Sequence, residues 1–405
     1  MERSQAICVV GLGYIGLPTA ALLANRGYQV HGVDINEAVV NRINQSQVHI
    51  IEPELDAFVR AAVQSGNLKA SIQPEQADIF IIAVPTPFRE ADYAPDLSYI
   101  ESATQAITPY LKQQNLVILE STSPVGSTEQ VQAVIDEQLG PQHGVDVAYC
   151  PERVMPGKIM RELVENDRIV GGVNQRATDK AVAFYETFVE GDVFQSDSRT
   201  AEMAKLTENS FRDTNIAFAN ELSMLCDQFD INVWQLIDLA NQHPRVNILK
   251  PGPGVGGHCI AVDPWFIIHK GGETAKIMRS ARDINTYKTQ WVIEKIKNAA
   301  LSFEKEQGRQ AQVACMGLAF KPNIDDLRGS PALFITQQLV EAGYNIVAVE
   351  PNIDHCDNIK LVELSEASQQ ADILVFLVGH HQFIGLDTQQ KSQQQALDFC
   401  GVLEQ

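Results

Sequence analysis

The chain has 405 residues, of which 45% are hydrophobic and 20% charged, a composition typical of a globular protein with two or three domains. Its formal net charge is −20. Nucleic acids and anionic membranes bind basic surfaces, so this acidic balance argues against both as partners, and no run of Lys or Arg offsets it.

After five residues the chain enters an apolar segment without a charged leader or cleavage site, and no apolar run approaches membrane-spanning length. We therefore expect a cytoplasmic protein. Its seven cysteines are widely spaced and contain no Cys-x-x-Cys pair. This pattern favours reduced thiols over a disulfide framework, and we expect no metal site.

The first motif is a glycine-rich turn between a predicted strand, Ala6 to Val10, and a predicted helix, Leu17 to Arg26. Its sequence is Gly11-Leu12-Gly13-Tyr14-Ile15-Gly16. In this context Gly11 allows the tight turn, Gly13 lets a pyrophosphate approach the helix, and Gly16 lets helix and strand pack closely. The motif therefore predicts a dinucleotide-binding domain.

An acidic residue completes this fingerprint. A second predicted strand, Val30 to Val33, ends at Asp34, 18 residues beyond the last glycine of the motif. A carboxylate there accepts hydrogen bonds from ribose hydroxyls and repels a 2′-phosphate. We therefore expect NAD rather than NADP.

Three further predicted strands end in polar turns, at the edge where parallel sheets bind ligands. They run from Ile79 to Val84, Val117 to Leu119 and Val145 to Cys150. Thr86 and Thr122 follow the first two and are candidates for the nicotinamide side. Glu152 and Arg153 follow the third, where they form either part of the site or an ordinary salt-bridged loop.

A long helix is predicted from Ala201 to about Phe229, with Ser198 or Thr200 as its N-cap. Lys205, Asn209 and Arg212 are spaced four and three residues apart, so they share one face. A lysine and an asparagine one turn apart can polarise the same substrate oxygen. A solvated polar face is the ordinary alternative.

A loop rich in glycine and proline, Pro251 to Gly257, presents one thiol, Cys259, with Asp263 four residues later. A thiolate is a strong nucleophile, and a nearby carboxylate can move protons or activate water. The alternative is a small buried apolar cysteine. Upstream of the loop, His243 and Arg245 could reach a carboxylate or phosphate, or cap the surface.

The end of the chain repeats its beginning. The segment from Val313 to Lys321 echoes Ile7 to Gly16, and Leu339 to Glu350 echoes Leu23 to Asp34. The second copy keeps one glycine of the fingerprint and has Phe320-Lys321 in the turn, so we expect it to bind a nucleotide diphosphate rather than a dinucleotide, or to serve only as a structural repeat.

Together these segments resemble the UDP-glucose/UDP-mannosaminuronate dehydrogenase family over nearly the whole chain. The matching motifs are Glu-Ser-Thr-Ser-Pro-Val-Gly-Ser-Thr (120–128), Ala-Glu-Met-Ala-Lys-Leu-Thr-Glu-Asn-Ser-Phe-Arg (201–212), Gly-Val-Gly-Gly-His-Cys-Ile-Ala-Val-Asp-Pro-Trp-Phe (254–266) and Phe-Lys-Pro-Asn-Ile-Asp-Asp-Leu-Arg (320–328). The resemblance implies an α/β fold with two Rossmann-like doubly wound domains joined by a central helical domain with one long helix. We place the boundaries at residues 1–196, 197–305 and 306–405.

The resemblance also implies roles for individual residues. Cys259 would be the nucleophile and Lys205 the proton donor or acceptor, while Asp263 or Glu152 would activate the hydrolytic water. The residues implied to contact NAD are Tyr14, Ile15, Asp34, Thr86, Thr122 and Arg328. Those implied to contact the UDP-sugar are Arg153, Val154, Lys205, Asn209, Arg212, His243, Arg245, Gly256, Phe320 and Lys321.

The family implies a homodimer or higher oligomer, with His243 and Arg245 supplied by the partner subunit. It also implies that an alcohol is oxidised twice, to an acid, through a covalent bond to Cys259. The sequence departs from the family pattern at Gly329 and Cys400. A two-electron β-hydroxyacid dehydrogenase and a non-catalytic NAD-binding scaffold are the alternatives.

Overall fold

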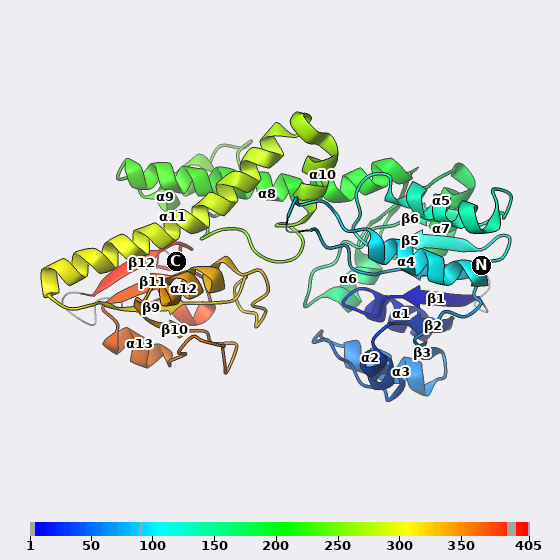
Figure 1. Ribbon diagram of the computed structural model, residues 1–405, viewed down its shortest axis with the longest axis horizontal. Helices are drawn as coiled ribbons and strands as arrows, with labels where there is room; N and C mark the ends of the chain where they lie inside the picture. The colour runs from blue at the N-terminus through cyan, green and yellow to red at the C-terminus, as the bar shows by residue number, and fades with distance from the viewer. Residues whose placement is uncertain (1–4, 90, 387–393, 404–405) are drawn as a thin grey trace. The chain divides into compact units, whose positions relative to one another are not determined.

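The computed structural model describes residues 5–89, 91–386 and 394–403. The chain divides into two compact units (Figure 1). The first is made of Met1–Glu208 and Trp265–Lys270, and the second of Asn209–Pro264 and Gly271–Gln405. Within the described ranges, no helix combines the length and apolar character needed to cross a bilayer.

The first unit is built on an eight-stranded sheet in the order β3-β2-β1-β4-β5-β6-β7-β8. All neighbouring strands run parallel except β6 and β7, which are antiparallel. The strands are β1 (Ala6–Val10), β2 (Gln29–Val33), β3 (Leu68–Ser71), β4 (Ile79–Ile82), β5 (Leu116–Leu119), β6 (Asp146–Tyr149), β7 (Arg168–Gly172) and β8 (Val193–Asp197). Five of these strands fall where the sequence predicts them, within about two residues at each end.

Helices cover both faces of this sheet. They are α1 (Gly16–Asn25), α2 (Glu37–Asn44), α3 (Leu55–Gln64), α4 (Ser98–Ile107), α5 (Ser127–Leu139), α6 (Ile159–Glu165) and α7 (Gln175–Tyr185), with a 3₁₀ turn, η1, at Thr108–Tyr110. Alternate residues of β1 point to opposite faces: Ile7 and Val9 pack in the core with α1 and α3, while Cys8 and Val10 pack with α4 and α5. The sheet is therefore doubly wound, as expected.

The second unit contains a smaller parallel sheet in the order β10-β9-β11-β12. Its strands are β9 (Gln312–Met316), β10 (Asn345–Val349), β11 (Ile373–Phe376) and β12 (Gln395–Asp398). The first two strands and the return crossover to β11 reproduce the arrangement of β2, β1 and β4 in the first unit. The predicted duplication of the fold is therefore present in the structure.

The helices α12 (Pro331–Glu341) and α11 (Lys276–Gln307) pack on one face of the smaller sheet, and α13 (Leu364–Gln370) packs on the other. The remaining helices are α8 (Ser198–Gln228), α9 (Val233–Ala240) and α10 (Asp263–Gly271), with 3₁₀ turns η2 at Gly272–Thr274 and η3 at His381–Phe383. Both α8 and α10 contribute residues to each unit.

The long helix α8 begins differently from the expectation. Asp197, rather than Ser198 or Thr200, provides the cap: its carboxylate accepts hydrogen bonds from the Thr200 backbone N–H at 2.9 Å and from the Thr200 hydroxyl at 2.7 Å. A carboxylate also interacts favourably with the positive end of the helix dipole, which explains why Asp is chosen over the two hydroxyl residues.

Candidate active site

The fingerprint turn has the geometry of a phosphate-binding loop. Gly11 has a φ of +92°, and a Cβ added there would lie 2.7 Å from the Ala83 carbonyl oxygen. A Cβ at Gly16 would lie 1.8 Å from the Gly11 carbonyl oxygen, so both positions require glycine. A Cβ at Gly13 would meet nothing within 4 Å. The backbone at Gly13 is therefore open to a ligand at the N-terminus of α1.

Asp34 connects β2 to this turn. One carboxylate oxygen accepts a hydrogen bond from the Leu12 backbone N–H at 3.0 Å, and the other accepts one from the Asn36 backbone N–H at 2.9 Å. The side chain is half-buried, as a ribose-binding carboxylate must be if its ligand is to reach it. Tyr14 is 37% exposed beside the same turn, and Ile15 is half-buried.

Replacing Asp34 with Ser should weaken NAD binding about tenfold or more and relax discrimination against NADP, because a carboxylate acceptor contributes about 1.5–3 kcal/mol and its charge repels the 2′-phosphate. Fluorescence titration with both cofactors measures the effect. Glu37→Gln removes an exposed carboxylate at the start of α2 and is the matched control. Equal NAD and NADP affinities in the unmodified protein would contradict the assignment.

The turns after β4 and β5 are tied together at the sheet edge. The Ser121 hydroxyl donates to the Val84 carbonyl oxygen at 2.7 Å, which fixes the turn that carries Thr122. Thr86, in the turn after β4, has a buried hydroxyl without a hydrogen-bond partner among the described residues. Both threonines thus lie where the sequence places them, at the carboxyl ends of neighbouring parallel strands.

One residue that sequence reasoning missed holds this edge in place. Glu202 of α8 is fully buried, and its carboxylate accepts hydrogen bonds from the Gly126 N–H at 2.6 Å, the Thr128 N–H at 2.7 Å and the Thr128 hydroxyl at 2.6 Å. It acts as an N-terminal anion for α5. The sequence around Glu202 does not indicate that this residue caps α5, because its partner Thr128 is 74 residues away in sequence.

The turn after β6 carries Glu152 and Arg153, and the structure gives them different surroundings. Arg153 forms an ion pair with Glu208 of α8 at 2.8 Å and donates to the Asp167 carbonyl oxygen at 3.2 Å. Glu152 is only 8% exposed, and burial raises the pKa of its carboxyl despite the opposing charges of Arg168 and Lys205. Val154 and Lys205 are half-buried in the same unit.

In the second unit, the segment from Pro251 to His258 is a loop, as predicted, and Cys259 is exposed rather than sealed in a core. The loop is anchored at two points. The Gly252 N–H donates to the Asn220 side-chain oxygen at 2.9 Å, and the Thr289 hydroxyl donates to the Pro253 carbonyl oxygen at 2.9 Å. The loop that leads to the thiol is therefore anchored at its start.

Asn209 and Asp263 form a buried pair, and Asp263 follows the thiol by four residues in the chain. The Asn209 side-chain N–H donates to Asp263 Oδ2 at 2.6 Å, and the Asp263 backbone N–H donates to the Cys259 carbonyl oxygen at 2.9 Å. Asp263 is 4% exposed and Asn209 8% exposed. The hydrogen bond fixes the direction of the Asn209 amide.

Gly256 is packed where no side chain fits. A Cβ there would lie 2.6 Å from both the Gly329 carbonyl oxygen and Pro331 Cδ. We expect Gly256→Ala to lower the free energy of unfolding by about 1–3 kcal/mol, because backbone must move to accommodate the methyl group. Gly252→Ala is the control, since its Cβ would have 3.8 Å to the nearest atom. Urea unfolding of both variants measures the difference, and equal stability would contradict the packing argument.

The turn of the second copy packs beside this loop. Phe320 lies within 3.1 Å of a Cβ added at Gly256, and Lys321 next to it is exposed. Arg328 is held by both oxygens of Asp326, at 2.9 Å and 2.8 Å. Gly329 has a φ of +61°, a conformation that favours glycine. The glycine at position 329, where the sequence departs from the family pattern, suits this left-handed backbone conformation. Asp326 orients the Arg328 side chain.

In the second copy of the fold, a buried carboxylate takes the position that Asp34 has in the first copy. Glu350, at the end of β10, accepts hydrogen bonds from the Leu318 N–H at 2.8 Å, the Ala319 N–H at 3.0 Å and the His380 ring at 3.0 Å. These bonds hold the pKa of the Glu350 carboxyl down, at about 2. The carboxylate is 5% exposed, so it is unsuited to bind a ribose as Asp34 does.

The remaining predicted residues lie on the surface. His243, Arg245 and Arg212 are exposed. Cys400, at the second departure, is half-buried, and its backbone N–H donates to the Asp398 carboxylate at 3.0 Å. No cluster of His, Cys, Asp or Glu suited to hold a metal ion occurs in the part of the chain that the structure describes.

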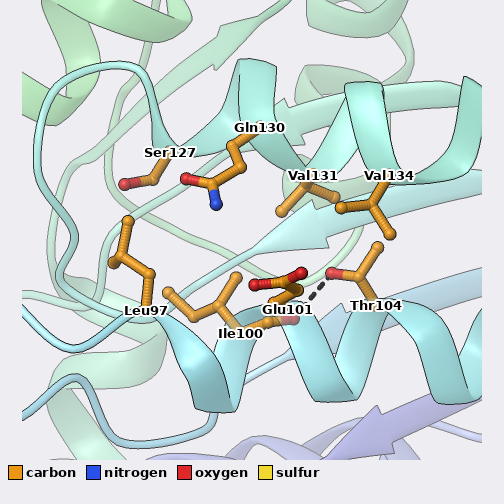
Figure 2. Close-up of a pocket in the computed structure, with 8 residues that line it drawn as sticks. All are labelled: Leu97, Ile100, Glu101, Thr104, Ser127, Gln130, Val131 and Val134. Atoms are coloured by element: carbon orange, nitrogen blue, oxygen red, sulfur yellow. Dashed lines mark hydrogen bonds between the residues drawn. The ribbon is translucent and has the colours of Figure 1, made fainter. Parts of the chain in front are cut away.

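A small cavity lies away from these residues, between α4 and α5 of the first unit (Figure 2). It is lined by four aliphatic and four polar or charged side chains and measures about 10 Å³. That volume admits about one water molecule. The cavity is therefore a packing gap rather than a substrate site.

Three segments of the chain match the three domain models of one protein family. Residues 5–189 match the NAD binding domain of the UDP-glucose/GDP-mannose dehydrogenase family, residues 199–287 match its central domain and residues 314–404 match its UDP binding domain. The chain belongs to the UDP-glucose/GDP-mannose dehydrogenase family. The family's NAD binding domain carries the fingerprint turn and Asp34, its central domain carries Lys205 and Cys259, and its UDP binding domain carries Phe320.

Individual members of this family are similar along their whole length. A UDP-N-acetyl-D-mannosamine dehydrogenase from Campylobacter jejuni is 53% identical, with 95% of this chain and 97% of the relative covered. An NDP-N-acetyl-D-galactosaminuronic acid dehydrogenase from Ralstonia solanacearum is 52% identical, with 98% and 96% covered. The solved structure of a UDP-D-ManNAc dehydrogenase from Pyrococcus horikoshii matches with a TM-score of 0.88 at 37% identity, covering 98% of this chain and 96% of that one.

Proposed function

We propose that this dehydrogenase oxidises the C6 alcohol of UDP-N-acetyl-D-mannosamine to the carboxylate, using two NAD molecules per sugar. The observation that carries the proposal is the exposed Cys259 on its anchored loop, beside the buried Asn209–Asp263 pair. A hydride acceptor alone stops at the aldehyde, whereas a thiol that forms a covalent adduct allows a second oxidation.

The choice of sugar rests on the relatives. Those at 50% identity or above include enzymes named for N-acetylmannosamine and for N-acetylgalactosaminuronic acid. Both names describe acetamido sugars, so an acetamido hexose is the substrate class we favour. The same chemistry on UDP-N-acetylglucosamine or UDP-glucose is the alternative. A β-hydroxyacid dehydrogenase is disfavoured because it has no use for residues 314–404, which match a UDP binding domain.

The residues that would hold NAD fit it. The open backbone at Gly13 would let a pyrophosphate approach the N-terminus of α1, and Asp34 would accept from the ribose, with Tyr14, Ile15, Thr86, Thr122 and Arg328 as further contacts. When bound, NAD accepts the hydride in each oxidation. The chain's own residues do the rest: they bind the sugar nucleotide, move protons and hold the carbon that is oxidised.

In the first oxidation, Lys205 takes the proton of the C6 hydroxyl, and Asn209 stabilises the oxygen with the amide N–H that Asp263 leaves available. Cys259 thiolate then adds to the aldehyde carbon, and the resulting thiohemiacetal loses its second hydride to give a thioester. Each well-aimed donor on the oxygen contributes on the order of 3 kcal/mol.

For the hydrolysis of the thioester, we favour Glu152 over Asp263 as the base. Asp263 already accepts a short hydrogen bond from Asn209, so one of its carboxylate oxygens is engaged. Glu152 has a raised pKa and one buried oxygen without a partner among the described residues. A base needs a free lone pair and a raised pKa to take a proton from water.

We also propose a homodimer formed along α8. Phe211, Phe218, Leu225 and Phe229 are spaced seven, seven and four residues apart and are 42–67% exposed. Such an apolar stripe on one helix face is typical of a helix-pairing surface. The exposed His243 and Arg245 would then be supplied to the partner's sugar nucleotide. We place the protein in the cytoplasm, with residues 1–196 for NAD, 197–305 for chemistry and dimerisation, and 306–405 for the nucleotide.

Measuring NADH formed per sugar consumed tests the proposal. UDP-N-acetylmannosamine, UDP-N-acetylgalactosamine, UDP-N-acetylglucosamine and UDP-glucose are supplied separately with NAD. We expect two NADH per sugar and the highest kcat/KM with the mannosamine derivative. One NADH per sugar would refute the covalent route, and turnover with none of the four would refute the family activity for this chain.

A further inference from the structure

A buried charged cluster lies behind Glu152 in the first unit. Arg168, at the start of β7, is 1% exposed, and Glu120, directly after β5, is 1% exposed. Together with Glu152, at 8%, they place one guanidinium and two carboxylates in a largely buried position. Buried charges are rarely retained without a specific role or a compensating network.

The antiparallel strand β7 brings Arg168 to this place. Ala148 pairs with Gly172 and Tyr149 with Gly171, so β7 begins at the edge of the sheet where β6 ends, and the charge of Arg168 acts on Glu152. If β7 ran parallel to β6, its first residue, Arg168, would lie at the opposite edge of the sheet. The single reversal in the sheet thus delivers a cation to the edge where Thr86 and Thr122 lie.

The cluster has more hydrogen-bonding capacity than the protein satisfies. Arg168 donates from Nη2 to the Leu163 carbonyl oxygen at 3.1 Å, while its Nε and Nη1 have no partner among the described residues. The same holds for one oxygen each of Glu120 and Glu152. Buried polar atoms of this kind are usually bridged by internal water, which also conducts protons.

The charges around the two carboxylates differ. Glu152 faces both Arg168 and Lys205, whereas the cation near Glu120 is Arg168, and the Thr19 hydroxyl donates to Glu120 at 3.4 Å. Cys150 and Tyr185 also face Arg168, and burial keeps both neutral by raising their pKa values, that of Cys150 to about 12. Lys205 thus lowers the pKa of the Glu152 carboxyl and has no counterpart among the described residues beside Glu120, whose pKa burial raises to about 7.

We propose that Glu120 is the internal proton acceptor for Glu152 during thioester hydrolysis, and that Arg168 is the positioning residue that couples the two carboxylates. This rests on the proposed function. Water adds to the thioester carbon, the C–S bond breaks to release the Cys259 thiolate, and the water proton passes to Glu152. The proton then moves through bridging water to ionised Glu120, which restores Glu152 as a base.

The test uses Glu120→Gln, which keeps the side-chain shape and removes the titrating oxygen. Single-turnover reactions of the full-length enzyme with UDP-N-acetylmannosamine and NAD are quenched, and the acyl group on Cys259 is followed by mass spectrometry. In the parent enzyme, we expect the hydrolysis rate to rise with pH through about 7. In the variant, we expect this inflection to vanish and hydrolysis at pH 8 to slow by about tenfold or more, with hydride transfer unchanged. A profile that superimposes on that of the parent enzyme would overturn the proposal.

A second measurement does not depend on turnover. Infrared spectra of the resting enzyme should show a carboxylic acid C=O band that disappears as pH rises through about 7, and Glu120→Gln should lack it. Arg168→Lys should shift the titration, while Glu137→Gln, at an exposed carboxylate of α5, should not. Absence of the band in the parent enzyme would overturn the proposal even if acid is formed. If the band is present and no sugar is turned over, the proposed function fails instead.

Discussion

Cys259→Ser should abolish acid formation, lowering its rate by about 10³-fold or more, while NAD binding stays intact. A serine hydroxyl has a far higher pKa than a thiol, so at neutral pH almost none of it is in the nucleophilic anionic form. The variant should stop after the first oxidation or before it releases acid. Product analysis by NMR, with NADH counted per sugar, measures the effect.

Cys259 differs from the other described cysteines in being exposed, so we expect the loss of acid formation for its substitution and not for theirs. The other cysteines of the described chain are buried or half-buried, and burial raises the pKa of the Cys315 thiol to about 11. Cys356→Ser, a buried position near the second sheet, is the matched control and should retain the parent rate of acid formation. Acid formation by Cys259→Ser at the parent rate would remove the covalent mechanism.

Local sequence signals predicted the framework correctly. The two doubly wound sheets, the glycine loop and the long helix α8 all carry periodicity or glycine spacing within a short stretch, and each lies where the pattern indicates. The duplication was readable because β9 and β10 repeat the residue pattern of β1 and β2. These features depend on neighbours in sequence, so the sequence alone is sufficient for them.

The parts that sequence reasoning missed depend on residues far apart in the chain. Glu202 caps α5 across 74 residues, and the charge of Arg168 acts on Glu152 because β7 runs antiparallel to β6. No local pattern marks a strand as antiparallel when both its faces are buried. The proposed preference for Glu152 over Asp263 as the base also rests on a long-range contact, the 2.6 Å bond from Asn209 to Asp263, which joins residues 54 positions apart.

Glu120 should make the stability of the first unit depend on pH. Burial raises its pKa from 4.5 to about 7 in the folded protein, so the folded state binds the proton more tightly than the unfolded state does. Stability is therefore highest below about pH 4.5, falls as pH rises through about 7, and then levels off. A difference of about 2.5 pKa units corresponds to about 3 kcal/mol.

Glu120→Gln isolates this contribution, because the amide resembles the protonated acid and does not titrate. At about pH 4, below both pKa values, the variant and the parent should unfold at nearly the same temperature. At pH 8 the variant should be more stable by about 3 kcal/mol, which for a unit of this size is a rise of roughly 6–12 °C in Tm. Glu137→Gln, at an exposed site, should follow the parent at both pH values. Parallel curves for Glu120→Gln and the parent would mean that Arg168 keeps Glu120 ionised throughout, since only full compensation by that guanidinium offsets the burial of the carboxylate.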